Sequence, residues 1–278
     1  MPRLLLMEGN VRKARERAAT LGVETPGEIY RRALLEEAPG LDIDMIFGAD
    51  PDAALPAGRW WSDYAGFVIS GSSLHAYDPE PAVSRQIELV RSAAEVGLPI
   101  LGSCWGLQIA AMAGSGMVAR NVDRAELGIA RKISPTAEGR THPLLAGRPA
   151  AFDAPCIHYD DVTVLPTGSV VLAANCHCPV QAAVIPLGRS EVWAVQYHPE
   201  FDLPHIAALL ATYEGELANS PFFESPEAVR AHVADLLTAT EAGAHSPAAW
   251  RLGLDSDVLD GPTRRTELRN WLHHAVHG

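Results

Sequence analysis

The sequence has few cysteines, a shortage of basic residues relative to acidic ones, and no long apolar run. Four cysteines among 278 residues do not make a disulfide framework, so we expect a reducing cytoplasm, in which a thiol stays free to react. The net charge of −12 argues against nucleic acid or an anionic membrane surface as a partner. The apolar run Leu4–Met7 is interrupted by Glu8, so it fits neither a membrane span nor a signal peptide.

The remaining composition, 47% apolar and 20% charged, is that of a globular protein with a sizeable core. In the first half of the chain, short apolar runs alternate with segments of helical periodicity. Strands are expected at residues 3–7, 43–47, 64–70 and 98–101, and helices at residues 10–21, 25–38, 81–96 and from 105 onward. Strands separated by such helices are typical of an α/β fold, with a parallel sheet covered on both faces.

From Met117 to Val195 the pattern changes to short apolar runs divided by Gly and Pro turns. Strands are expected at residues 129–133, 163–165, 170–173, 180–185 and 191–197, with no long helix among them. We interpret these strands as antiparallel additions to one edge of the sheet. The sheet is therefore expected to be mixed but mostly parallel.

The end of the chain returns to helical signals. A helix is expected from Pro204 to about Leu217, and three further helices are expected from Pro226, Pro247 and Pro262. Serine precedes the first two of these prolines, as is typical of a helix N-cap followed by a first-turn proline. We predict a catalytic domain over residues 1–217 and a C-terminal helical extension over residues 218–278.

The central apolar run ends in Gly102-Ser103-Cys104-Trp105-Gly106, after which a helix is expected. Glycines on both sides of Cys104 allow a tight strand-to-helix turn with a thiol at its apex. A thiol at a helix N-terminus is favoured as thiolate by the partial positive charge there. The other interpretation is a core cysteine beside an ordinary glycine-rich turn.

A nucleophilic Cys104 needs a base, and His198 is the best candidate because it follows an apolar strand. Glu200, two residues later, is placed to accept a hydrogen bond from the far imidazole nitrogen. The backbone N–H of Trp105, with an amide of the Gly71-Ser72 turn, is expected to form an oxyanion hole. Both turns follow parallel strands, so they should lie at the same edge of the sheet. The pattern predicts acyl transfer.

Residues 102–108, Gly-Ser-Cys-Trp-Gly-Leu-Gln, and residues 197–201, Tyr-His-Pro-Glu-Phe, resemble the two signature motifs of class I (triad-type) glutamine amidotransferases. Residues 67–72 are similar to the oxyanion strand and loop of that family. Residues 158–162, His-Tyr-Asp-Asp-Val, are similar to a stretch of its GMP-synthetase-like branch. The resemblance covers about residues 1–215 and leaves the C-terminal extension unexplained.

The resemblance implies a flavodoxin-like fold and attack of Cys104 on a γ-carboxamide, with a γ-glutamyl thioester as intermediate. It also implies that Gln108 and the Gly71 loop hold the glutamyl group, with His158 and Asp160 nearby. No cofactor and no metal are expected. The expected ligand is a small γ-glutamyl molecule, and a homodimer and a synthetase or ligase partner are the assemblies left open.

One departure from the family pattern bears on the substrate. Residues 70–73 read Ser-Gly-Ser-Ser where biosynthetic members usually have Ser-Gly-Gly-Pro, and Ala76-Tyr77-Asp78 follows. This form resembles stand-alone γ-glutamyl peptidases and γ-glutamyl-amide hydrolases. We therefore expect hydrolysis of a γ-glutamyl amide. The first alternative is a glutaminase subunit that supplies ammonia to a separate synthetase. The second, less favoured, is a binding protein without turnover.

Two groups of residues contain side chains of the types that bind metal ions. Cys176 and Cys178, with Cys156 and His158, offer zinc ligands, but the Cys-x-Cys spacing is unusual for zinc. The alternative is a pair of cysteines that face opposite ways. Aspartates near the C-terminus lack the glycine and distal glutamate of a calcium loop and are expected in a solvated loop; they are Asp255, Asp257 and Asp260.

Overall fold

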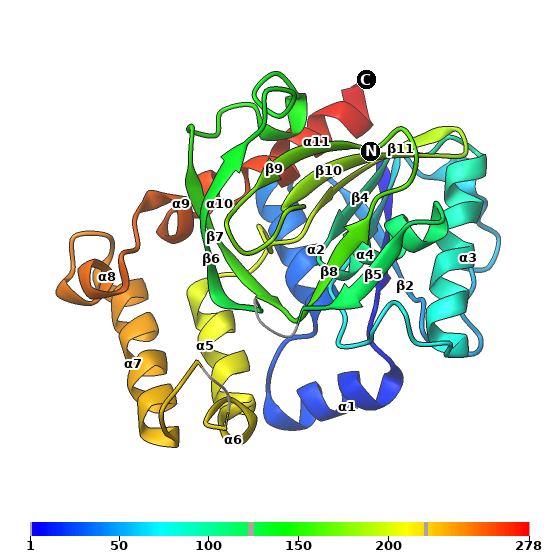
Figure 1. Ribbon diagram of the computed structural model, residues 1–278. Helices are drawn as coiled ribbons and strands as arrows, with labels where there is room; N and C mark the ends of the chain where they lie inside the picture. The colour runs from blue at the N-terminus through cyan, green and yellow to red at the C-terminus, as the bar shows by residue number, and fades with distance from the viewer. Residues whose placement is uncertain (1, 122–124, 220–221, 278) are drawn as a thin grey trace.

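The computed structural model describes residues 2–121, 125–219 and 222–277, and within them nine strands form one mixed sheet (Figure 1). Its order is β2-β1-β3-β4-β11-β10-β9-β6-β7, with β5 and β8 forming a separate pair. The strands are β1 (Arg3–Glu8), β2 (Asp42–Phe47), β3 (Gly66–Ile69), β4 (Ile100–Ser103), β5 (Met117–Arg120), β6 (Glu126–Pro135), β7 (Phe152–His158), β8 (Asp160–Val164), β9 (Val170–Ala174), β10 (Ala182–Leu187) and β11 (Ser190–Val195). The α/β fold with a mostly parallel central sheet is confirmed.

Helices connect the first strands, and further helices form the part of the chain that follows β11. They are α1 (Arg12–Leu21), α2 (Pro26–Glu37), α3 (Pro81–Glu95), α4 (Trp105–Ala113), α5 (Leu203–Thr212), α6 (Glu214–Leu217), α7 (Pro226–Ala242), α8 (Pro247–Leu252), α9 (Ser256–Leu259), α10 (Gly261–Arg264) and α11 (Thr266–His277), with short 3₁₀ turns η1 (Trp61–Asp63) and η2 (Pro143–Leu145). None of the helices in the described ranges is long and apolar enough to cross a membrane.

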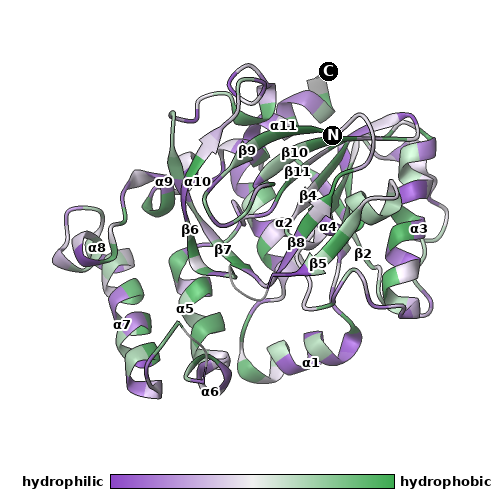
Figure 2. Cartoon of the chain, in the orientation of Figure 1, coloured by the Kyte–Doolittle hydropathy of each residue, from purple (hydrophilic) through white to green (hydrophobic). Residues whose placement is uncertain are grey.

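Side chains of the central strands alternate between two cores, as the period of two in a strand requires. Leu5 and Met7 of β1 point into one core, which contains the apolar residues of α3 and α4. Leu4 and Leu6 point into the other, which contains the apolar residues of α2 and α11. Figure 2 shows the purple, hydrophilic residues of α3 on one side of that helix. Helices therefore cover both faces of the sheet.

The antiparallel part of the sheet joins the parallel part at β11, which pairs parallel with β4 and antiparallel with β10. Beyond β10, strands β9, β6 and β7 are all antiparallel to their neighbours. The sequence did not predict β7, because Pro155 interrupts its apolar pattern. β7 is an edge strand, where a residue without an N–H costs no inner-sheet hydrogen bond.

The C-terminal helices begin where the serines predicted. Ser225 Oγ accepts from the Ala228 N–H at the start of α7, and Ser246 Oγ accepts from the Ala249 N–H at the start of α8. Figure 1 shows α7 beside α5. The predicted third helix is instead divided into α10 and α11, and Asp260 caps α10 by accepting from the Thr263 N–H.

The last helix, α11, is part of the main core. Leu268 and Trp271 are fully buried among the residues of β1, β3 and α2. A Cβ placed on Gly66 of β3 would lie 2.7 Å from the Trp271 ring, so the helix packs directly on the strand backbone. The domain boundary at residue 217 stays a prediction, but this core includes side chains from beyond it.

Trp271→Ala is predicted to lower the free energy of unfolding by about 3–5 kcal/mol, since it leaves a cavity against β3. Trp250 on α8 is 83% exposed, so Trp250→Ala should change stability by less than about 0.5 kcal/mol. Urea unfolding followed by circular dichroism measures both variants. Equal, small effects would contradict the packing of α11 in the core.

Candidate active site

Cys104 lies at the turn between β4 and α4, in a backbone conformation that few residues adopt. Its φ of 51° and ψ of −96° place a non-glycine residue at positive φ, as expected for a nucleophile on a strained strand-to-helix turn. A Cβ on Gly102 would lie 2.6 Å from the Gly106 carbonyl carbon, so only glycine lets β4 and α4 approach this closely. The predicted tight turn is present.

His198 follows β11, the strand next to β4. The register pairs Ser103 with Val195, so Cys104 and His198 both follow the carboxyl ends of neighbouring parallel strands. The Cys104 N–H donates to the Val195 carbonyl at 2.7 Å, and the His198 N–H donates to the Pro155 carbonyl at 2.8 Å. These backbone bonds hold the thiol and the imidazole at adjacent strand ends.

The imidazole of His198 is buried between a carboxylate and the thiol. Its Nδ1 lies 2.7 Å from Glu200 Oε1, and the ring stacks on Phe201 with centroids 3.9 Å apart. Burial opposes charge on the ring, but the negative charges of Glu200 and of a Cys104 thiolate, and hydrogen bonds to both side chains, raise the pKa of His198 to about 10. The geometry matches a Cys-His-Glu triad.

The Gly71-Ser72 turn lies beside this triad. A Cβ on Gly71 would lie 2.9 Å from His198 Cε1, so the glycine lets the turn approach the ring. The loop after β1 holds the turn in place: Ser72 Oγ donates to the Gly9 carbonyl at 2.9 Å, and Asn10 Oδ1 accepts from the Ser73 N–H at 2.9 Å.

Gln86 of α3 joins the loop after β1 to the start of α4. It was not among the residues predicted to form the site. The Trp105 indole N–H donates to Gln86 Oε1 at 2.8 Å, and Gln86 Nε2 donates to the Gly9 carbonyl at 3.1 Å. The fully buried amide thus connects the start of α4, which is expected to supply one oxyanion donor, to the loop that holds the Gly71-Ser72 turn. The signal was present in the sequence, since Gln86 lies with Val83 and Val90 on the buried face of α3.

Gln108 of α4, His158 of β7 and Asp160 of β8 are each buried, and Gln108 contacts Asp160. Gln108 Nε2 donates to the Asp160 carbonyl at 3.0 Å. The Asp160 carboxylate binds two residues of the segment after the Gly71 turn: His75 Nδ1 at 2.6 Å and the Tyr77 hydroxyl at 3.3 Å. In this structure Asp160 therefore fastens that segment to β8, and its role toward a substrate stays a prediction.

His158 lies between two carboxylates. Its Nε2 is 3.1 Å from Glu126 Oε2, and its Nδ1 is 3.2 Å from Asp161 Oδ1. Burial opposes the charged ring, but these two carboxylates outweigh burial and raise the pKa of His158 to about 9. Glu126 also accepts from Asn175 and Gln181, at 2.7 and 2.5 Å. No sequence motif singled out Glu126 as part of this cluster.

The cysteines of the candidate zinc site differ in their exposure to solvent. Cys176 is exposed, whereas Cys178 is buried, and Cys178 Sγ donates to the Val180 carbonyl at 3.4 Å. Ligand atoms of Cys178, His158 and Asp161 lie within 4.8 Å of one another. The ion pairs of His158 already occupy two members of this group, and the expectation of a metal-free site stays a prediction.

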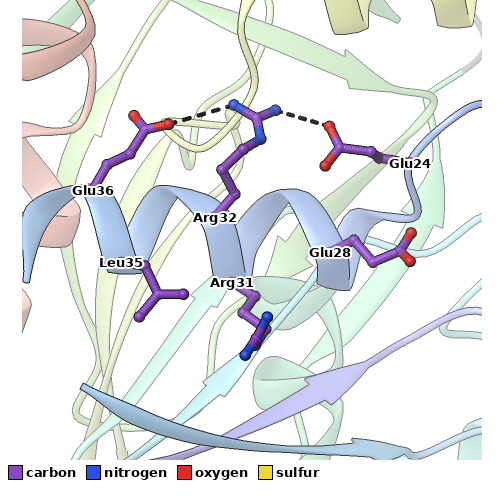
Figure 3. A pocket seen from close by; sticks show the side chains of 6 residues that line it. All are labelled: Glu24, Glu28, Arg31, Arg32, Leu35 and Glu36. Carbon is purple, nitrogen blue, oxygen red and sulfur yellow. Dashed lines mark hydrogen bonds and ion pairs between the residues drawn. The ribbon is translucent and has the colours of Figure 1, made fainter. Parts of the chain in front are cut away.

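A hollow on the outer surface of α2 is lined mostly by charged side chains. Figure 3 shows Arg32 between Glu24 and Glu36, with ion-pair distances of 3.0 and 3.6 Å. The hollow is lined by Glu24, Glu28, Arg31, Arg32, Leu35 and Glu36. None of these six side chains is a nucleophile, and none belongs to the Cys104 site.

Comparisons with known proteins agree with this geometry. Residues 46–210 match the family model of class-I glutamine amidotransferases. A γ-glutamyl-L-1-hydroxyisopropylamide hydrolase from a Pseudomonas species is 33% identical over 99% of this chain and 93% of that protein. A glutamine-hydrolyzing GMP synthase from Thermomicrobium roseum is 35% identical, over 49% of this chain and 23% of the synthase.

Solved structures show the same fold. The crystal structure of a glutamine amidotransferase from Thermotoga maritima superposes with a TM-score of 0.70 and covers 100% of this chain and 99% of its own. The two sequences are 18% identical, so this likeness supports the fold alone.

Gly71→Ala is predicted to slow alkylation of Cys104 by iodoacetamide about tenfold, because the added methyl group would displace the His198 ring from the thiol. The backbone of Gly71 is outside the positive-φ region, so alanine adds bulk without backbone strain. Intact-mass spectrometry in a Cys176→Ser background follows the reaction. Gly215→Ala, where a Cβ meets nothing within 4 Å, is the control, and equal rates in both variants would contradict the close approach.

Proposed function

The chain belongs to the class-I glutamine amidotransferase family, and on that premise we propose that it hydrolyses γ-glutamyl amides through a thioester on Cys104. The observation that carries the proposal is the Cys104-His198-Glu200 arrangement, in which a buried imidazole lies against both a carboxylate and a thiol. The near full-length likeness to a hydrolase of a γ-glutamyl amide supports the substrate class.

In the first half of the proposed reaction, Cys104 Sγ attacks the γ-carbonyl carbon of the bound amide. The carbonyl oxygen becomes an oxyanion, which the Trp105 N–H and an amide of the Gly71-Ser72 turn stabilise. His198 holds the thiol proton and donates it to the leaving nitrogen as the C–N bond breaks. A γ-glutamyl thioester remains and a free amine leaves.

In the second half, a water molecule attacks the thioester carbon. His198, now neutral, accepts the proton of that water, and the same backbone N–H groups stabilise the second oxyanion. The C–S bond breaks, glutamate leaves, and the proton returns to restore the Cys104-His198 pair. Glu200 keeps the imidazole oriented and stabilises its charged form throughout.

A second candidate function is a glutaminase that supplies ammonia to a separate synthetase. It is favoured by the likeness to a glutamine-hydrolyzing GMP synthase, in which the matched part is 23% of that protein. The two functions share the chemistry at Cys104 and differ in the amine that leaves. A substrate comparison therefore separates them.

The purified protein is predicted to release glutamate from γ-glutamyl alkylamides at least about tenfold faster, in kcat/KM, than from glutamine. Enzymatic quantification of glutamate across a panel of γ-glutamyl amides measures this ratio. Cys104→Ser should abolish turnover on every substrate while leaving the circular dichroism spectrum unchanged.

Other outcomes of the same panel are decisive. Faster turnover of glutamine, or activity that depends on an added synthetase, would favour the glutaminase function. Ligand binding without turnover by the folded wild-type protein would contradict both enzymatic functions.

The rate should fall in alkaline solution because His198 must carry a proton to release the amine. With its pKa raised to about 10, His198 is protonated at neutral pH and loses its proton as the pH rises through that value. Activity is thus retained at neutral pH and lost above about pH 10, as a kcat/KM profile against pH measures.

Glu200→Gln should move this alkaline limb to lower pH, by about 1–3 units, because it removes the negative charge that favours the imidazolium. An unchanged limb in this variant would show that another group controls the alkaline loss.

A further inference from the structure

Tyr197, the residue before His198, is tied to the C-terminal helix. Its side chain is fully buried in the core that contains α2 and α11, and its hydroxyl donates to Glu267 Oε1 at 2.8 Å. Its ring also meets Phe152 of β7 edge-on, with centroids 5.7 Å apart. A residue near the end of the chain therefore holds the side chain adjacent to the proposed base.

Glu267, in the first turn of α11, is itself fixed by a buried ion pair. Arg148 Nε donates to Glu267 Oε1 at 2.8 Å, and another guanidinium nitrogen donates to Oε2 at 2.7 Å. The two side chains are 1% and 0% exposed. The same guanidinium donates to the Arg264 carbonyl at 2.8 Å and lies 4.5 Å from the centre of the Phe152 ring. A bidentate, desolvated pair of this kind is a rigid anchor.

The same face of the sheet also supports the nucleophile. The hydroxyl of Tyr30, on α2, lies 2.9 Å from Ser103 Oγ, and both side chains are buried. Tyr30 belongs to the same core as Tyr197 and the residues of α11. Two buried tyrosine contacts thus fix the residues that directly precede Cys104 and His198.

We propose that Glu267 is a positioning residue for His198 and acts through the Tyr197 hydroxyl. This inference rests on the proposed use of His198 as base. The C-terminal extension is then part of the catalytic scaffold, because α11 supplies the acceptor that fixes the strand end carrying the imidazole. Loosening that acceptor lets the His198 ring move relative to Cys104, and a small displacement of a catalytic group lowers the rate steeply.

The test removes the Tyr197 hydroxyl and measures the Cys104-His198 pair without a substrate. Tyr197→Phe in the full chain keeps the ring in its core position and leaves the Arg148-Glu267 pair intact. In a Cys176→Ser background, iodoacetamide should alkylate Cys104 of this variant about tenfold more slowly at neutral pH. On a γ-glutamyl amide, kcat should fall by a similar factor with KM nearly unchanged.

Arg269→Ala is the matched control on the same helix. Arg269 is 48% exposed in its side chain and pairs with Glu37 at 3.3 Å, so the variant weakens a contact of α11 without touching Tyr197. It should alkylate at the parent rate. All rates are taken well below the Tm of every variant, as thermal unfolding followed by circular dichroism establishes.

Glu267→Gln tests whether Glu267 acts on His198 through Tyr197. The amide oxygen can still accept from Tyr197 but lacks the charge that fixes it to Arg148. This change should slow alkylation in the parent and have no further effect in Tyr197→Phe; where it unfolds the chain, Tyr197→Phe alone decides. Alkylation of Tyr197→Phe at the parent rate would overturn the proposal. Because alkylation needs no substrate, that result is distinct from a failure to hydrolyse γ-glutamyl amides.

Discussion

The close approach of two backbones at Gly102 and Gly106 is the constraint on which the site depends. It lets β4 pass into α4 with a single residue at the apex, and that residue, Cys104, takes a positive φ. Such a conformation persists only where the surroundings hold it. Here the hold comes from the hydrogen bond of the Cys104 N–H to β11 and from the buried start of α4.

The same strand, β11, connects the proposed nucleophile to the rest of the molecule. It is the last parallel strand and the first member of the antiparallel part, so His198 follows the boundary between the two halves of the sheet. Three contacts hold the segment around His198: the hydrogen bond to the β7 backbone at Pro155, the close approach of the Gly71 turn, and the hydrogen bond of Tyr197 to Glu267. The proposed base is thereby positioned by parts of the chain that lie far apart in the sequence.

Sequence patterns predicted the local parts of this arrangement well. The short apolar runs and serine-proline caps have their own signals, and the strand-to-helix turn at Cys104 is marked by glycines. Contacts that depend on the third dimension were not predicted. Gln86 is marked only by its place on the buried face of α3, and Glu126 and Glu267 have no motif around them. Their partners become neighbours only when the sheet forms. The strand β7 was not predicted because it contains Pro155. A proline is tolerated in a strand at the edge of a sheet, and the sequence does not show which strands lie at an edge.

The proposed reaction requires a covalent γ-glutamyl intermediate on Cys104, formed with the help of a His198 held at the end of β11. The most direct measurement is rapid acid quenching of the enzyme during turnover of a γ-glutamyl amide, followed by peptide mass spectrometry. The peptide containing Cys104 should gain the mass of one glutamyl residue, and the same peptide of the Cys104→Ser variant should show no such gain. Turnover by the wild-type enzyme with the adduct on another residue, or on none under conditions that trap thioesters, would contradict the proposed reaction.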